Sequence, residues 1–229
     1  MSLKRIVVLI SGSGSNLQAI MDAIQSGQIN GQIELVISNK ADAYGLIRAK
    51  NAGIATCVID HKAFDSRESF DLAVQQRIDT IEPDLVILAG FMRILSAGFV
   101  RHYSGRMLNI HPSLLPKYKG LHTHQRALAA ADKEHGCTVH FVTEELDGGP
   151  LLVQAVVPVK TDDTEATLQA RVHEREHVAY PLAVEWICAD RIRVCEDGIY
   201  RDNELLPASG FRLAYNEKTD SGASDATHS

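Results

Sequence analysis

The stretch Ile6-Val7-Val8-Leu9-Ile10-Ser11-Gly12-Ser13-Gly14-Ser15-Asn16 decides the fold of this chain. Its five consecutive apolar residues predict a strand that is buried on both faces, and a glycine-rich turn follows at once. From Asn16 onward, apolar residues recur at helical spacing, namely Leu17, Ile20, Met21 and Ile24. A buried strand, a tight turn and a helix in this order are typical of α/β proteins.

The same alternation continues through the first half of the chain. Further apolar strands are predicted at residues 33–38, 55–59, 85–88 and 107–110. Helices are predicted at 44–51, stopped by Gly53, and at 66–81, stopped by Pro83. Glu68, near the start of the helix at 66–81, suggests a capping box. Apolar strands separated by helices predict an open, twisted, Rossmann-like parallel sheet with helices on both faces.

The pattern changes after about residue 132. Strands are predicted at 138–143 and 151–159, and a long helix at 165–188. Strands at 192–194 and near Ile199 flank Glu196-Asp197-Gly198, which is typical of a hairpin. No repeat or linker is evident, so we expect one α/β domain over residues 1–216 with mixed C-terminal strands. Residues 217–229 are polar and are expected to be a disordered tail.

Composition excludes several functional classes. The chain has 229 residues, 45% of them hydrophobic, and a net charge of −6, which argues against a nucleic acid or an anionic membrane as partner. No apolar stretch approaches the roughly 20 residues of a membrane span, and the first apolar run is too short for a signal peptide. The four cysteines form no close pair, which is typical of free thiols in a reducing compartment. We expect a cytoplasmic protein.

The glycine-rich turn is a candidate anion site, because it lies between a strand and the N-terminus of a helix. No lysine follows it, as a Walker loop would require. Leu17 replaces the third glycine of a dinucleotide fingerprint, and Ser38-Asn39-Lys40 stands where an acid would be expected. A single phosphate monoester requires neither feature. A plain tight turn is the structural alternative.

A second motif, Asn109-Ile110-His111-Pro112-Ser113-Leu114-Leu115-Pro116, ends the fifth predicted strand. Residues i and i+2 of a strand share a face, so Asn109 and His111 are expected to face one pocket at the strand's carboxyl end. An amide donor beside an imidazole suits a reaction that builds an oxyanion and moves a proton. Asp147 could stabilise the protonated imidazole. Taken singly, a core histidine and an ordinary Asp-Gly turn are the simpler interpretations.

Together with the glycine-rich turn and Leu146-Asp147-Gly148-Gly149-Pro150, this motif resembles the formyltransferases that use 10-formyltetrahydrofolate. The resemblance covers about residues 4–210. It implies the formyltransferase-like fold and a catalytic set of Asn109, His111 and Asp147. In that family the substrate amine is the nucleophile, the Asn and the His donate hydrogen bonds to the formyl oxygen, and the Asp supports the charged His.

The resemblance also implies the binding residues. The most similar enzymes formylate 5-phosphoribosylglycinamide (GAR) in de novo purine synthesis, and its phosphate would bind Gly14, Ser15 and Asn16, with Glu176 near the glycinamide. The implied contacts of 10-formyltetrahydrofolate are Arg67, Met92, Arg93, Ile94, Leu95, Asn109, Thr143, Glu144, Glu145, Leu146 and Asp147. Residues 1–105 would mainly bind the phosphate, and residues 106–216 would mainly supply the catalytic and folate sites.

Three other functions stay open at this point. Formyltetrahydrofolate hydrolase shares the catalytic set but sends water to the formyl group, and it usually carries an N-terminal regulatory domain. Formylation of methionyl-tRNA is expected with a further C-terminal domain. A silent phosphate-binding module is the non-enzymatic alternative.

Histidines could in principle suggest a metal site, since His122-Thr123-His124, His135 and His140 are grouped in the sequence. No cysteine or acidic partner completes a ligand set, so we expect no metal. Lys119 stands where proline is more familiar in the family, which bears on the rigidity of its loop. We expect a monomer or weak homodimer that binds small molecules, with no nucleic acid or membrane partner.

Overall fold

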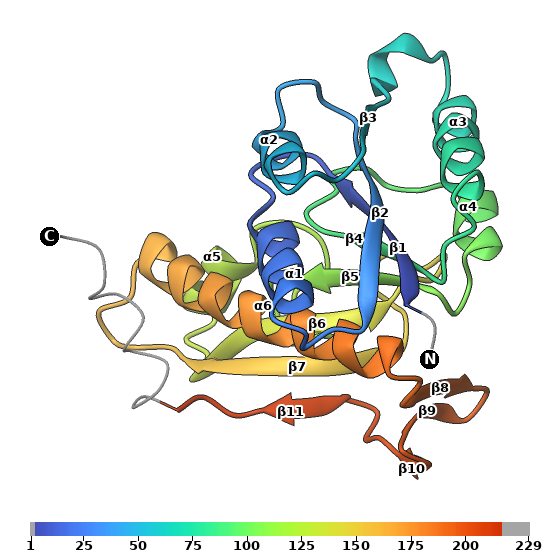
Figure 1. Cartoon of the computed structure of the whole chain (residues 1–229). Coiled ribbons are helices and arrows are strands. Elements are labelled where there is room, and N and C mark those ends of the chain that lie inside the picture. The colour runs from blue at the N-terminus through green and yellow to red at the C-terminus, as the bar shows by residue number, and fades with distance from the viewer. Residues whose placement is uncertain (1–2, 217–229) are drawn as a thin grey trace, which may run out of the picture.

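The computed structural model describes residues 3–216, which form a mixed eight-stranded sheet covered by helices and an attached three-stranded sheet (Figure 1). The first half contains β1 (Lys4–Ile10), α1 (Ser15–Gln25), β2 (Gly31–Ser38), α2 (Tyr44–Asn51), β3 (Thr56–Val58), the 3-10 helix η1 (His61–Ala63), α3 (Arg67–Asp79), β4 (Leu85–Leu88) and α4 (Ala97–His102). The second half contains β5 (Met107–His111), α5 (Thr123–Ala129), β6 (Glu134–Phe141), β7 (Leu151–Pro158), α6 (Glu165–Cys188), β8 (Ile192–Cys195), β9 (Gly198–Arg201), β10 (Glu204–Leu205) and β11 (Phe211–Leu213).

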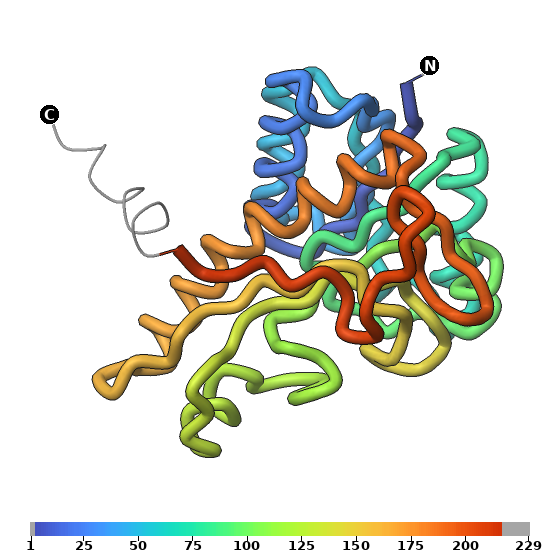
Figure 2. The backbone as a smooth tube through the Cα atoms, turned by 90° about the horizontal axis from the view of Figure 1, so that it is seen from below, coloured from blue at the N-terminus to red at the C-terminus, as the bar shows by residue number. Residues whose placement is uncertain are grey.

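The large sheet has the strand order β11-β7-β6-β5-β4-β1-β2-β3. Each neighbouring pair among β1, β2, β3, β4 and β5 is parallel, whereas β6 is antiparallel to both of its neighbours, β5 and β7. Figure 2 shows β11 returning alongside β7, to which it pairs in parallel. The prediction of a parallel, Rossmann-like N-terminal half with mixed C-terminal strands is therefore confirmed.

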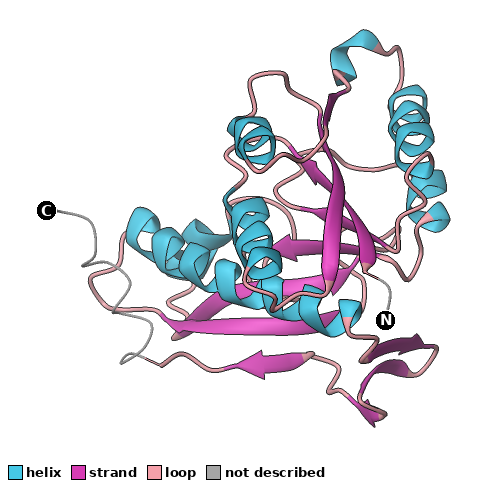
Figure 3. Cartoon of the chain, in the orientation of Figure 1, coloured by secondary structure: helices cyan, strands magenta, loops and turns pink. Residues whose placement is uncertain are grey.

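Two apolar cores lie on opposite faces of this sheet, as the helix layers in Figure 3 indicate. One core packs α1, α2 and α6 against the sheet, and the other packs α3 and α4. Residues Ile6 to Ile10 of β1 are fully buried. A strand between two helical layers has no solvent face, which explains its unbroken apolar run.

Several local predictions differ from the structure. The capping box of α3 joins Ser66 to Ser69, because the residue three positions after the N-cap is Ser69, and Glu68 has no part in it. Strand β6 begins at Glu134, well before the predicted residue 138, since its first residues include polar ones that hide the apolar pattern. Helices α4 and α5 and strand β11 were not predicted. The expected disorder of 217–229 lies outside the described residues.

A buried pair of imidazoles connects α5 to β6. The Nδ1 atom of His124 lies 3.1 Å from Nε2 of His135. Burial, helped by the neighbouring His124, lowers the pKa of His135 to about 4 from its ordinary value of 6.5. The folded protein therefore keeps His135 neutral over a pH range in which the unfolded chain binds a proton.

We expect this histidine to make folding sensitive to acid. Its contribution to the free energy of unfolding is complete above about pH 6.5 and is lost as the pH falls toward 4, by up to about 3 kcal/mol. Urea unfolding between pH 4 and 8 measures this. His135→Gln should flatten the acid limb by about one proton, and the exposed-site control His122→Gln should not. An unchanged limb in His135→Gln would contradict the prediction.

Candidate active site

The candidate site lies at the carboxyl ends of β1, β4 and β5. The strand order reverses at β1, whose neighbours are β2 and β4, and ligands of open α/β sheets bind at such a reversal. The glycine-rich turn follows β1, the segment 91–95 follows β4, and His111 is the last residue of β5. The sheet thus brings the three predicted parts of the site to one edge.

The glycine-rich turn packs tightly against α2. Gly14 is the N-cap of α1 and has a φ of +71°, and a Cβ atom there would lie 2.5 Å from the Cα atom of Gly45. The Gly45 amide donates to the carbonyl of Gly12 at 3.0 Å, and Arg48 Nε donates to the carbonyl of Ser13 at 2.9 Å. Around Gly12 a Cβ atom would meet nothing within 4 Å, so the turn stays open on its outer side.

We expect Gly14→Ala to destabilise the fold by about 1–3 kcal/mol, because alanine disfavours this φ and its methyl group meets the backbone of α2. Gly27→Ala is the matched control, since Gly27 has a φ of +80° and open space around it, and it should lose only the smaller backbone component. Urea unfolding measures both variants. Equal losses would show that the contact with Gly45 contributes nothing.

Helix α6 brings an acid and a histidine to this turn. Asn16 Nδ2 donates to Glu176 Oε2 at 2.8 Å, and Ser15 Oγ lies 2.7 Å from His173 Nε2. Burial raises the pKa of the Glu176 carboxyl, while the bond from Asn16 acts in the opposite direction. The predicted neighbours Ser15, Asn16 and Glu176 therefore lie together. His173 was not predicted, although its i, i+3 spacing from Glu176 puts both on one helix face.

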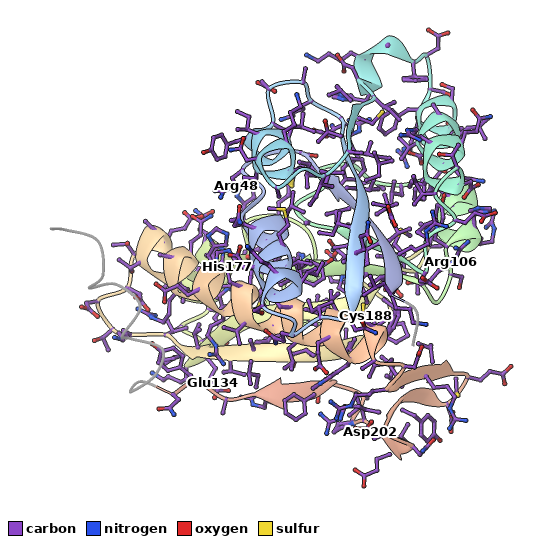
Figure 4. All side chains as sticks on the ribbon, in the orientation of Figure 1. Arg48, Arg106, Glu134, His177, Cys188 and Asp202 are labelled. Carbon is purple, nitrogen blue, oxygen red and sulfur yellow. The ribbon has the colours of Figure 1, made fainter. Side chains whose placement is uncertain are left out.

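The turn also borders an open groove. Figure 4 shows Arg48 and His177 beside α1, from α2 and α6 respectively. Both residues line, together with Ser15 and further residues of α1, a groove of about 670 Å³. Burial, His173 and Arg48 lower the pKa of His177.

His111 is held by two partners in a buried environment. Its Nδ1 atom lies 3.5 Å from Oδ2 of Asp147, and both side chains are buried. Its Nε2 atom lies 2.8 Å from the carbonyl oxygen of Tyr118. A carbonyl oxygen can only accept, so Nε2 carries a hydrogen. Asp147 Oδ2 also accepts the amide hydrogen of Gly120 at 2.9 Å, which ties the loop of Tyr118 to the loop of Asp147.

Asn109 is oriented by a histidine that the sequence interpretation considered only as a metal ligand. His140 Nδ1 lies 3.0 Å from the Phe141 carbonyl, so it carries a hydrogen and leaves Nε2 as an acceptor. Asn109 Nδ2 lies 3.3 Å from this Nε2 atom and donates to it. Burial lowers the pKa of His140, which favours this neutral form. Asp147 Oδ1 lies 3.9 Å from the same Nε2 atom of His140.

Two loops beside this cluster present exposed apolar side chains. Met92 and Ile94 are 66% and 59% exposed, and Leu146 is 53% exposed. Apolar surface next to a polar cluster is what a ligand with a flat ring system requires. Arg93 and Leu95 are half-buried in the first of these loops.

The other candidate folate contacts lie at the surface. Arg67, Thr143, Glu144 and Glu145 are exposed. Glu144 pairs with Arg101 at 2.8 Å, and Glu145 pairs with Lys119 at 2.7 Å. Lys119, the unusual residue of its loop, therefore joins that loop to the loop of Asp147. Within residues 3–216, no hydrogen bond or ion pair joins Arg67 to another candidate residue.

Two kinds of feature are absent from the part of the chain that the structure describes. Within residues 3–216, no group of three or more His, Cys, Asp and Glu side chains is arranged to hold a metal ion. The helices of the same residues include none that is both long and apolar enough to cross a membrane.

Comparisons with known proteins agree with this geometry. The model of the formyl transferase family matches residues 4–184. Phosphoribosylglycinamide formyltransferase of Escherichia coli K12 is 56% identical over 206 residues, covering 90% of this chain and 97% of that protein. The human trifunctional purine biosynthetic protein adenosine-3 is 48% identical over 194 residues, which is 85% of this chain and 19% of that protein.

Solved structures give the same result. The phosphoribosylglycinamide formyltransferase of Coxiella burnetii matches with a TM-score of 0.89 at 52% identity, covering 92% of this chain and 99% of that chain. A glycinamide ribonucleotide transformylase from Symbiobacterium toebii matches with a TM-score of 0.84 at 44% identity, covering 87% and 94%. The family match over residues 4–184 includes the glycine-rich turn, the Asn-x-His motif and most of α6, which together form the candidate site.

Proposed function

The chain belongs to the formyl transferase family, and we propose that it transfers the formyl group of 10-formyltetrahydrofolate to the amine of GAR in de novo purine synthesis. The observation that carries this proposal is the position of two polar groups at one sheet edge. One is the turn of Ser15 and Asn16 with Glu176, and the other is His111 with Asp147 and Asn109. Support also comes from relatives with this activity that match over nearly their whole length.

In this reaction the glycyl amine attacks the formyl carbon, and the electrons of the carbonyl bond move to its oxygen. The Asn109 amide and the Nε2–H of His111 are the donors that we assign to this oxygen. The Nε2–H now bonds the Tyr118 carbonyl, so the formyl oxygen would replace that carbonyl as acceptor. His140 keeps one hydrogen of the Asn109 amide engaged, which fixes the direction of the other.

Asp147 supports the same step through charge. Its carboxylate faces His111 Nδ1 and compensates the positive charge of a protonated imidazole. As the intermediate collapses, the bond from carbon to N10 of the folate breaks, and the proton lost by the amine ends on N10. Asp147 is the group that we assign to guiding this proton through a water.

The phosphate of GAR would position the substrate and would take no part in the bond changes. Backbone N–H groups at the start of α1 and the side chains of Ser15 and Asn16 suit a phosphate monoester. Glu176, bonded to Asn16, would then face the ribosyl or glycinamide part. Binding at a remote anchor reduces the entropy lost when the amine meets the formyl carbon.

A formyl-transfer assay tests this function. Release of the formyl group is expected to be slow with 10-formyltetrahydrofolate alone and strongly accelerated by GAR, with the formyl group recovered on the substrate amine. The matched control is glycinamide ribonucleoside, which lacks the phosphate and should accelerate far less. Release of free formate at one rate with or without GAR would favour the hydrolase alternative.

A further inference from the structure

A single buried hydroxyl lies between the two proposed substrate sites. Ser11 follows β1, directly before the glycine-rich turn, and is 4% exposed. Its Oγ atom accepts the amide hydrogen of Met92 at 2.8 Å. The same Oγ donates to Oδ1 of Asn39 at 2.6 Å. The turn after β1 and the segment after β4 are thereby joined through one side chain.

Asn39 fixes the direction of this hydroxyl. It follows β2 and is 1% exposed, so its amide has little freedom to turn. Its Nδ2 atom lies 3.3 Å from Nδ1 of His61, in η1. The hydroxyl hydrogen of Ser11 is donated to Asn39, so the lone pairs of the hydroxyl oxygen are available to accept the amide hydrogen of Met92. Residues from the ends of three neighbouring strands therefore meet at Ser11.

The far end of the segment 92–95 is also held by a buried side chain. Asp71, on α3, is 1% exposed and accepts the amide hydrogen of Ser96 at 2.5 Å. Between these two anchors the segment forms no helix or strand, and its Met92 and Ile94 side chains are exposed. The position of the segment therefore depends on the hydrogen bonds that backbone amides donate to Ser11 at one end and to Asp71 at the other.

The opposite side of the glycine-rich turn is pinned to α2 by the bonds of Gly12 and Ser13 described above. Gly12, the first of these two pinned residues, directly follows Ser11 in the chain. A ligand that orders the turn at Gly14 to Asn16 therefore also restricts Ser11, and Ser11 in turn restricts the amide of Met92. A ligand that orders the segment 92–95 acts on the turn by the reverse route.

We propose that Ser11 is a positioning residue that couples the two substrate sites, so that GAR and the folate each strengthen the binding of the other. This inference rests on the proposed function, because it assumes a phosphate at the turn and a folate at the segment 92–95. Asn39 orients Ser11, and Asp71 gives the segment its second fixed end. Coupling is reciprocal, so one factor applies to both ligands.

Calorimetry on the full chain tests the coupling. The Kd of GAR is measured with and without saturating tetrahydrofolate, which has no formyl group to transfer. In the wild type, tetrahydrofolate should tighten GAR binding about 5-fold or more, the lower range of couplings between sites. GAR should tighten tetrahydrofolate binding by the same factor. In Ser11→Ala the factor should fall toward 1.

Ser26→Ala is the matched control, because Ser26 also donates its hydroxyl hydrogen, to the carbonyl of Ala23, but at the far end of α1. It should keep the wild-type factor. A Ser11→Ala protein with the wild-type factor, or a wild type with no coupling, overturns the inference. A wild type that binds no GAR and transfers no formyl group instead overturns the proposed function.

Hydrogen exchange on the wild type tests the same inference without any variant. GAR alone, with no folate present, should slow exchange of the amides at 92–95 as well as those of the glycine-rich turn. Protection restricted to the turn and α6 would mean that the phosphate site does not reach the segment, and the inference would fail even if Ser11→Ala cannot be produced folded.

Discussion

Replacing His111 with alanine is expected to lower kcat for formyl transfer by about 10²-fold or more, the usual scale for a positioned acid–base group. Two effects combine in this variant. In the proposed mechanism, the developing oxyanion loses the Nε2–H donor, and Asp147 loses the imidazole whose charge it compensates during the reaction. The KM for GAR should change little, because Asn16 and Glu176 bond each other independently of His111.

The control for this variant is His102→Ala. His102 lies on α4 and bonds Asp79, so it tests the removal of an imidazole outside the site. Steady-state kinetics and thermal unfolding of both variants decide the matter. The His111→Ala protein also loses the bond to the Tyr118 carbonyl, so its melting temperature shows whether the loop loosens. A folded His111→Ala protein with near-wild-type kcat would remove His111 from the mechanism.

Much of the fold could be predicted from the sequence because strong local signals mark its main elements. Helix α2 (Tyr44–Asn51) has the predicted bounds, since Gly53, with a φ of +72°, follows its end. Helix α6 (Glu165–Cys188) also has the predicted bounds, although Pro181 lies inside it. The apolar runs of β1 and β4 identify strands that are buried on both faces.

The missed elements lack such signals. Helices α4 and α5 have 6 and 7 residues, too few for a periodic pattern to be distinguished from a loop. Strand β11 has 3 residues and exists because β7 offers it a free edge, which depends on a pairing across about sixty positions of the chain. Only tertiary structure specifies an element of that kind.

The candidate site divides in the same way. Asn109 and His111 could be identified because strand alternation is local, and they lie on β5 as expected. The importance of His140 follows from the register of β5 against β6, which sets it opposite Asn109. No sequence pattern gives that register. The group that accepts from His111 is the backbone carbonyl of Tyr118. Every residue has such a carbonyl, so the residue type at position 118 does not reveal this role.

The candidate folate contacts show a further limit of prediction from sequence. Met92 and Ile94 could be named only through family resemblance, because exposed apolar side chains in a loop look like residues that pack into a core. The bond from Met92 to Ser11 joins residues 81 positions apart, and the bond from Ser96 to Asp71 joins residues 25 positions apart. Buried polar residues that hold a binding segment become visible only when the partners of each backbone amide are known.

The second large effect is expected for Asp147→Asn, which should lower kcat by about 10²-fold while leaving the KM for GAR close to the wild-type value. The substitution keeps shape and removes charge. Asp147 has a φ of +50°, a backbone conformation that asparagine tolerates well. The Gly120 amide requires an acceptor, so the amide oxygen of the new side chain must face it.

The amide nitrogen then takes the position of Oδ1, on the side of His140 Nε2, and the amide oxygen faces both Gly120 and Nδ1 of His111. An amide oxygen can accept a hydrogen from Nδ1, but it carries no negative charge to compensate an imidazolium. The geometry of the cluster would survive without the charge that compensates an imidazolium. Asp197→Asn, in the exposed turn between β8 and β9, controls for loss of a carboxylate elsewhere. Wild-type kcat in folded Asp147→Asn would reduce Asp147 to an acceptor for Gly120 and would show that catalysis needs no compensating charge beside His111.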